Sequence, residues 1–196
     1  MDYKNRLKGV VTQVLLKSLL EDAGYRIVPL GIEEVLRELA CLDEAKYKEL
    51  KLPDQLRKLP DFFVADIDFQ ETFLVEVKYR KKWNPTTRAN LQEVLLQQTR
   101  LWNPLLLIIF LGNSAKPHYQ DEKPSHFIKT TQLRSENNNI YFLNSSREWM
   151  IWEEADWDKF IRIQDIFIHV EDQREYQTIT KATSILKSLV SLDLFE

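Results

Sequence analysis

The stretch from Leu59 to Arg80 constrains the fold more than any other part of this 196-residue chain. It holds two runs of strand-forming residues, 62–67 and 72–79, on either side of a short turn near 68–71. This arrangement predicts a β-hairpin. Successive side chains of a strand point to opposite faces, so Glu76 and Lys78 are expected side by side on one face of the second strand.

Asp61 directly precedes the first strand and lies fifteen positions before Glu76. The hairpin can therefore bring these two carboxylates to one point. Two carboxylates that face one point offer oxygen ligands to a hard divalent cation such as Mg²⁺ or Mn²⁺. A lysine beside them can orient a water or stabilise the charge that develops on a phosphate. The chemistry predicted from these residue types is hydrolysis of a phosphodiester.

Pro60-Asp61 followed by Glu76-Val77-Lys78 resembles the signature of the PD-(D/E)xK nuclease superfamily, which includes restriction endonucleases, archaeal Holliday-junction resolvases and RecB-type nucleases. The expected helices on either side of the hairpin, from Gly9 and from Leu91, are also similar to those of the family. The resemblance implies a restriction endonuclease-like α/β fold with a mixed central β-sheet flanked by helices. Residues 1–113 would form this core, and residues 114–196 a C-terminal α/β extension packed on the same domain.

The resemblance also implies roles for individual residues. Asp61 and Glu76 would bind Mg²⁺ or Mn²⁺ together with the main-chain carbonyl of Val77, and Lys78 would orient the attacking water. The implied activity is a metal-dependent endonuclease that acts on DNA. One alternative is a catalytically inactive nuclease-fold module with a nucleic-acid-binding or assembly role, in which Glu76 and Lys78 are merely a salt pair. A more remote alternative is a nuclease that processes RNA.

Two glutamines on the expected helices are further candidates. Gln13 shares a helix side with Leu16 and Leu20, so it can face the sheet. In the resembling families a glutamate often stands at this place and helps hold the metal, whereas a glutamine brings no charge. Gln98, with Trp102 four residues later, is similar to the Gln-x-x-x-Tyr element of RecB-like nucleases. The alternative for both glutamines is an ordinary helix residue.

A basic segment follows the expected catalytic strand. No acidic residue occurs from Val77 to Gln92, and the segment contains four cations beyond Lys78, at Arg80, Lys81, Lys82 and Arg88. These side chains could hold a nucleic-acid backbone, and the alternative is a solvated loop. The formal net charge of -3 argues against a protein that coats nucleic acid without specificity, although it permits a local basic surface.

Periodicity predicts the other elements. Leu7, Val10, Val11, Val14, Leu15 and Leu19 recur at helical spacing and predict the first helix, and a strand over 25–30 follows it. Residues 33–59 are predicted to be a helical insert, residues 84–87 a loop, residues 91–102 a helix and residues 105–111 a fully buried strand.

The second half of the chain gives weaker signals. Residues 114–139 are predicted to be loop-rich, and strands are expected at 140–143 and 166–170. Trp149, Trp152 and Trp157 are interpreted as core or interface residues rather than as platforms for unpaired bases. An amphipathic helix over 176–192 would either close the core or form a homodimer. With no apolar run long enough to span a bilayer and no signal peptide, no membrane association and a cytoplasmic location are expected.

Overall fold

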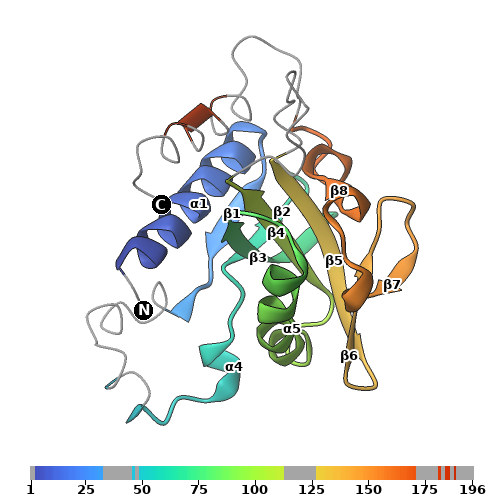
Figure 1. Cartoon of the computed structure of the whole chain (residues 1–196). Helices are drawn as coiled ribbons and strands as arrows, with labels where there is room; N and C mark the ends of the chain where they lie inside the picture. Colours follow the sequence, from blue (N-terminus) through green and yellow to red (C-terminus); the bar gives the residue numbers. More distant parts are fainter. Residues whose placement is uncertain are drawn as a thin grey trace.

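The computed structural model describes residues 3–32, 49–112 and 127–170, with the isolated positions 46, 181, 184, 185 and 188. These residues form a mixed α/β fold around an open eight-stranded sheet (Figure 1). The strand order is β1-β2-β3-β4-β5-β6-β7, and β8 pairs with β5. The strands are β1 (Arg26–Pro29), β2 (Phe62–Ala65), β3 (Thr72–Arg80), β4 (Leu105–Leu111), β5 (Ile128–Glu136), β6 (Asn139–Leu143), β7 (Trp149–Ile151) and β8 (Ile161–Arg162).

The sheet is mixed because β3 and β4 are parallel while the other pairs are antiparallel. A parallel pair needs a crossover connection, and helix α5 (Pro85–Thr99) lies in this one. Every residue of β4 is buried, as predicted for a strand covered on both faces. Helix α1 (Tyr3–Asp22) contributes to the core on one face of the sheet, and α5 contributes to the core on the other.

Helix α1 forms as predicted, but not every apolar residue of its periodic pattern is buried. Val10 and Val14 are 49% and 57% exposed. The buried apolar side chains are Leu15, Leu16, Leu19 and Leu20. Both sets have helical spacing, and the sequence alone could not decide between two overlapping apolar faces. Gln13 shares the side of Leu16 and Leu20, as predicted, and it faces the sheet.

Helix α5 begins earlier than predicted. Residues 84–87 were expected to be a loop, but Pro85 is the first helical residue and Asn84 is the N-cap. The Asn84 side chain accepts a hydrogen bond from the main-chain N–H of Thr87 at 2.8 Å. Proline suits the first helical position because its missing N–H would have no partner there. The polar residues that suggested a loop therefore form the N-terminal capping sequence of the helix.

Strand β5 corrects the prediction that residues 114–139 are loop-rich. Residues 113–126 lie outside the described part of the chain, but residues 128–136 pair with both β4 and β6. Thr130 and Thr131 are buried, and their hydroxyls donate to the carbonyls of Leu107 at 3.0 Å and Leu143 at 2.8 Å. A polar strand can occupy the interior because these hydroxyls are satisfied.

The aromatic residues after β6 are mainly core residues, as interpreted from the sequence. Trp152 and Trp157 are buried, whereas Trp149 is half-buried. The strand predicted at 166–170 is wrong, because the main-chain N–H groups of Phe167 and Val170 bond back to the carbonyls of Ile163 and Phe167. These bonds make turns, and the side chains of Phe167 and Val170 still reach the core.

Two predictions fall mainly on residues outside the described ranges. The helical insert at 33–59 is described only in part, including α4 (Asp54–Arg57), and the helix at 176–192 only at the isolated positions. Within the described residues, no helix is long and apolar enough to cross a membrane.

Candidate functional site

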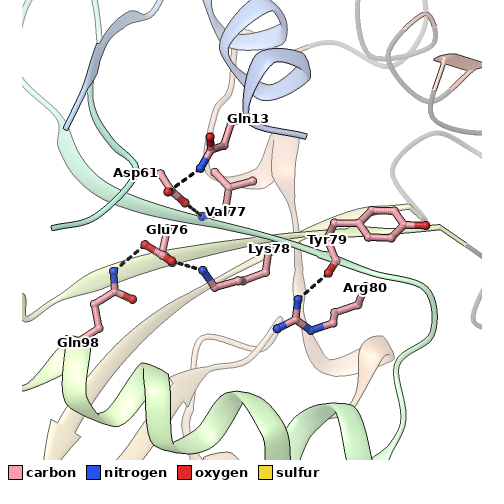
Figure 2. A network of polar contacts seen from close by, with 8 residues as sticks. All are labelled: Gln13, Asp61, Glu76, Val77, Lys78, Tyr79, Arg80 and Gln98. Carbon is pink, nitrogen blue, oxygen red and sulfur yellow. Dashed lines mark hydrogen bonds and ion pairs between the residues drawn. The ribbon is translucent and has the colours of Figure 1, made fainter. Parts of the chain in front are cut away.

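The hairpin of β2 and β3 positions the candidate site. Phe62 pairs with Val75 and Ala65 pairs with Thr72, which agrees with the hairpin predicted from the sequence. Asp61 directly precedes β2, and its carbonyl accepts a hydrogen bond from the N–H of Leu30 at 2.9 Å. This bond connects the start of β2 to the end of β1. The Asp61 side chain is thereby held beside Glu76 and Val77 of β3 (Figure 2).

Both oxygens of the Asp61 carboxylate accept hydrogen bonds. Gln13 donates to Oδ1 through Nε2 at 2.7 Å, and the main-chain N–H of Val77 donates to Oδ2 at 2.7 Å. The first bond links α1 to the hairpin, and the second links the residue before β2 to β3. The structure thus brings together Gln13, Asp61 and Val77, three of the predicted site residues.

Glu76 is 5% exposed, and both of its oxygens also accept hydrogen bonds. Lys78 donates to Oε1 through Nζ, and Gln98 of α5 donates to Oε2 through Nε2 at 2.6 Å. Glu76 and Lys78 therefore share one face of β3, as the period of a strand requires. Five predicted side chains and the Val77 main chain therefore form two hydrogen-bonded groups on β3, one around Asp61 and one around Glu76 (Figure 2).

Gln98 has one buried polar atom that remains to be satisfied. The residue is 5% exposed, and among the described residues its Oε1 has no hydrogen-bond partner. The amide orientation follows from Glu76, because an ionised carboxylate accepts hydrogen bonds and so requires the amide nitrogen to face it. A buried acceptor without a partner is costly. The atom therefore marks a place beside Glu76 where a donor such as water would be stabilised.

Burial and neighbouring charge control the protonation of the site. Burial, and then the Glu76 carboxylate, raise the pKa of Asp61 from 3.8 to about 7. Burial by itself would lower the pKa of the Lys78 ammonium, but the carboxylates of Glu76 and Asp61 outweigh it and leave that pKa raised. Lys78 is thus a hydrogen-bond donor at neutral pH rather than a free base. Two carboxylates share one ammonium, so the site has an unbalanced negative charge when both are ionised.

The donor set suits a hard divalent cation. The N–H and C=O of one strand residue point to the same edge, so the N–H bond from Val77 to Asp61 directs the Val77 carbonyl toward the same edge of β3. Two carboxylates and this carbonyl are oxygen ligands. A cation would also balance the excess negative charge. In the described part of the chain no cluster of three or more His, Cys, Asp or Glu side chains could hold a metal. The carbonyl of Val77 and water are further oxygen ligands for a site with two carboxylates.

The predicted basic residues do not lie in equivalent surroundings. Lys81 and Lys82 are exposed just after β3, while Arg80 is half-buried at its end. Arg88 lies on α5, where Nη1 donates to the carbonyl of Ala155 at 3.2 Å. Trp83 donates to the same carbonyl at 3.1 Å. Arg88 therefore ties α5 to the segment after β7, and it differs in this respect from the two exposed lysines.

Two residues near the site were not predicted. Gly112 follows β4, and a Cβ at this position would collide with the hydroxyl of Tyr79. Lys8 of α1 lies over the Tyr79 ring, with Nζ 5.9 Å from the ring centroid. A glycine directly after a fully buried strand was the available signal for the first. No pattern in the sequence distinguishes Lys8 from other surface lysines.

Comparison with protein-family models, with curated proteins and with solved structures gives no significant match.

Proposed function

We propose that this chain is a divalent-metal-dependent nuclease that hydrolyses phosphodiester bonds in DNA on a restriction endonuclease-like core formed by residues 1–113. The proposal is carried by the placement of Asp61, Glu76 and Lys78 at the part of β3 just beyond its ladder with β2, where Asp61 bonds to the main chain of Val77 and Lys78 bonds to Glu76. The parallel pairing of β3 with a buried β4 also supports it, because the motif then lies on a rigid central strand.

Asp61, Glu76 and the carbonyl of Val77 would hold Mg²⁺ or Mn²⁺. The bound cation would neutralise phosphate charge and favour an ionised water. Gln13 and Gln98 fix the two carboxylates by hydrogen bonds to one oxygen each, which limits their rotation. A preorganised pair of ligands loses less freedom when it binds a cation.

Lys78 would act on the water and on the phosphate. Its ammonium has three donors, and Glu76 occupies one of them. The remaining donors can orient an attacking water and stabilise the negative charge that develops on a phosphate oxygen. The buried Oε1 of Gln98 can accept a hydrogen bond from the same water, which would orient the lone pair of that water.

One feature favours the alternative of an inactive nuclease-fold module. Gln13 is neutral, so the site has two carboxylates where the resembling families often have three, and cation binding is expected to be weaker. Assembly or nucleic-acid binding could then be the whole role of the fold. The two functions differ in a measurable property, because only the nuclease cuts a strand.

The test is cleavage of plasmid DNA by the purified protein in Mg²⁺, Mn²⁺ or EDTA. We expect nicking or cutting with either cation and none in EDTA, and we expect Asp61→Asn and Lys78→Ala to abolish it. Lys17→Ala is the matched control, since Lys17 is an exposed lysine of α1 that lies 3.9 Å from Glu21. Equal cleavage by wild type and Lys78→Ala would refute the proposal, and cleavage of RNA alone would favour the RNA-processing alternative.

A further inference from the structure

Arg80 extends the row of functional side chains along β3. It follows Lys78 by two positions, so its side chain lies on the same face, about 7 Å farther along the strand. Figure 2 shows Glu76, Lys78 and Arg80 on the side of β3 toward α5, and Tyr79 on the other side. The guanidinium is therefore the next polar group that a strand bound at Lys78 would meet.

The guanidinium of Arg80 lacks an acidic partner in the described part of the chain. Its Nη1 donates to the carbonyl of Tyr79 at 2.6 Å, which satisfies one of its five N–H donors. The side chain is half-buried, and burial lowers the pKa of the group. A partly buried cation without a carboxylate is stabilised by a bound anion. Lys81 and Lys82, by contrast, are exposed and follow the end of the strand.

The main chain holds Arg80 in place. It pairs with Leu111 in the parallel ladder with β4, and its carbonyl accepts a hydrogen bond from the N–H of Gly112 at 2.8 Å. Tyr79 packs against Gly112 on the other face, where any side chain at position 112 would collide with it. The guanidinium thus extends from a fixed point, and its remaining donors form a planar fork that matches phosphate oxygens.

We propose that Arg80 binds the phosphate next to the scissile one, so that the site takes a strand with at least two consecutive phosphates. This inference rests on the proposed nuclease function and adds to it one specific substrate contact, between Arg80 and the phosphate next to the scissile one. Lys78 and Arg80 then contact neighbouring phosphates of one strand, because the strand spacing separates their side chains along β3. Such a contact depends on one linkage, whereas a diffuse positive field acts on several.

The experiment measures binding of oligonucleotides in which a single linkage is a neutral methylphosphonate, with Ca²⁺ in place of Mg²⁺ to suppress cleavage. For the wild type, we expect a neutral linkage next to the cutting position to weaken binding by about tenfold or more, as for a hydrogen bond to a charged group. In Arg80→Gln this loss should disappear, while the losses at other linkages remain. Arg80→Lys keeps the charge without the fork and should show a reduced loss.

Arg134→Gln is the matched control. Arg134 is also a half-buried arginine on a strand, with its side chain 39% exposed and its guanidinium 4.4 Å from the Trp149 ring centroid. It lies on β5, so its variant should keep the wild-type pattern. Circular dichroism verifies folding, and Arg80→Lys decides the matter if Arg80→Gln is unfolded. An unchanged loss next to the cutting position in the folded Arg80 variant would overturn this inference while DNA binding stands. A wild type that neither binds nor cuts DNA would overturn the proposed function as well.

Discussion

The carboxylate of Asp61 accepts a hydrogen bond from the main-chain N–H of Val77 at 2.7 Å. The ladder between β2 and β3 runs from Thr72 to Val75 on β3, so this side chain takes the place of a main-chain partner just beyond the last ladder pair. It satisfies a strand N–H that would otherwise need water. The same bond fixes the carboxylate in the plane of the sheet. Local folding and the geometry of the candidate site thus depend on one side chain.

Removal of metal should make the stability of the protein depend on the ionisation of Asp61. Its pKa is raised from 3.8 to about 7 in the folded protein, first by burial and then by Glu76. The folded state binds this proton more tightly than the unfolded state, so the free energy of unfolding should fall as pH rises between these two values. Urea denaturation in EDTA at about pH 5 and about pH 8 measures the effect.

Asp61→Asn provides the control for this pH dependence, because an amide still accepts a hydrogen bond but does not titrate. We expect a flatter profile for this variant. We also expect Mg²⁺ to stabilise the wild type more at the higher pH, where both carboxylates are ionised. A wild type that gains stability across the same range in EDTA would contradict the raised pKa.

Gln13→Glu should tighten the binding of divalent cations. Gln13 donates to Asp61 at 2.7 Å, so a carboxylate there would add a third negative charge to the site. We expect an affinity for Mn²⁺ higher by about tenfold and a lower melting temperature in EDTA, because the carboxylates repel each other. Calorimetric titration and thermal melts test both effects.

The control for this variant is Ser18→Glu, which adds the same charge to the exposed side of α1. It should change neither Mn²⁺ affinity nor the effect of EDTA. Equal Mn²⁺ affinity in Gln13→Glu and wild type would mean that residue 13 does not act on the bound cation.

The hairpin and the site were predictable because they depend on local rules. Alternation along a strand placed Glu76 beside Lys78, and the helical period placed Gln13 with Leu16. Strand β5 could not be predicted in this way. Its buried threonines are stabilised by carbonyls of β4 and β6, which are distant in sequence, so tertiary hydrogen bonds outweigh its polar composition.

The surroundings of Arg80 and Arg88 could not be predicted from the sequence either. Both occur in the same acid-free basic segment, but Arg80 ends β3 whereas Arg88 contacts the Ala155 carbonyl. That difference arises from the packing of α5 against residues more than sixty positions away. Composition identified the basic segment, but only the fold distinguishes a candidate phosphate ligand from a residue that ties two elements together.

Lys78→Ala should destabilise the metal-free protein, and Mg²⁺ should offset part of the loss. Glu76 is buried and loses its ammonium partner in this variant, which leaves two carboxylates without a neighbouring cation. We expect a loss of about 1–3 kcal/mol in EDTA. The increase in melting temperature on addition of Mg²⁺ should be larger than for the wild type. An identical increase would mean that Lys78 and the cation do not interact with the same carboxylates.

Gly112→Ala should destabilise the end of β3. The new Cβ would collide with the hydroxyl of Tyr79, and relieving the collision requires movement of a packed ring. We expect a cost of about 1–3 kcal/mol, and a smaller cost when Tyr79→Phe removes the hydroxyl. Urea denaturation of the two single variants and the double variant measures this coupling. Additive losses would show that residue 112 does not contact Tyr79.

Loss of the exposed lysines after β3 should weaken DNA binding and make the affinity less dependent on salt concentration. Lys81 and Lys82 are exposed, and if each contacts a phosphate, its loss removes about 0.9 from the slope of log affinity against log salt concentration. The double variant Lys81→Gln, Lys82→Gln should therefore bind all sequences more weakly, by a similar factor, since contacts to the backbone carry no base information. Fluorescence anisotropy at several salt concentrations, with Ca²⁺ in place of Mg²⁺, measures the slope.

Two comparisons make this measurement specific to the loop. Lys17→Gln with Lys159→Gln removes the same charge from exposed lysines that lie near Glu21 and Glu154, and this pair should leave the slope unchanged. Arg88→Gln loses a hydrogen bond to the Ala155 carbonyl, so it should lower stability by about 1 kcal/mol and change the slope less than the loop variant. An unaltered slope in the Lys81 and Lys82 variant would assign these side chains to solvent and would move the search for the DNA groove to the tryptophan-rich C-terminal half.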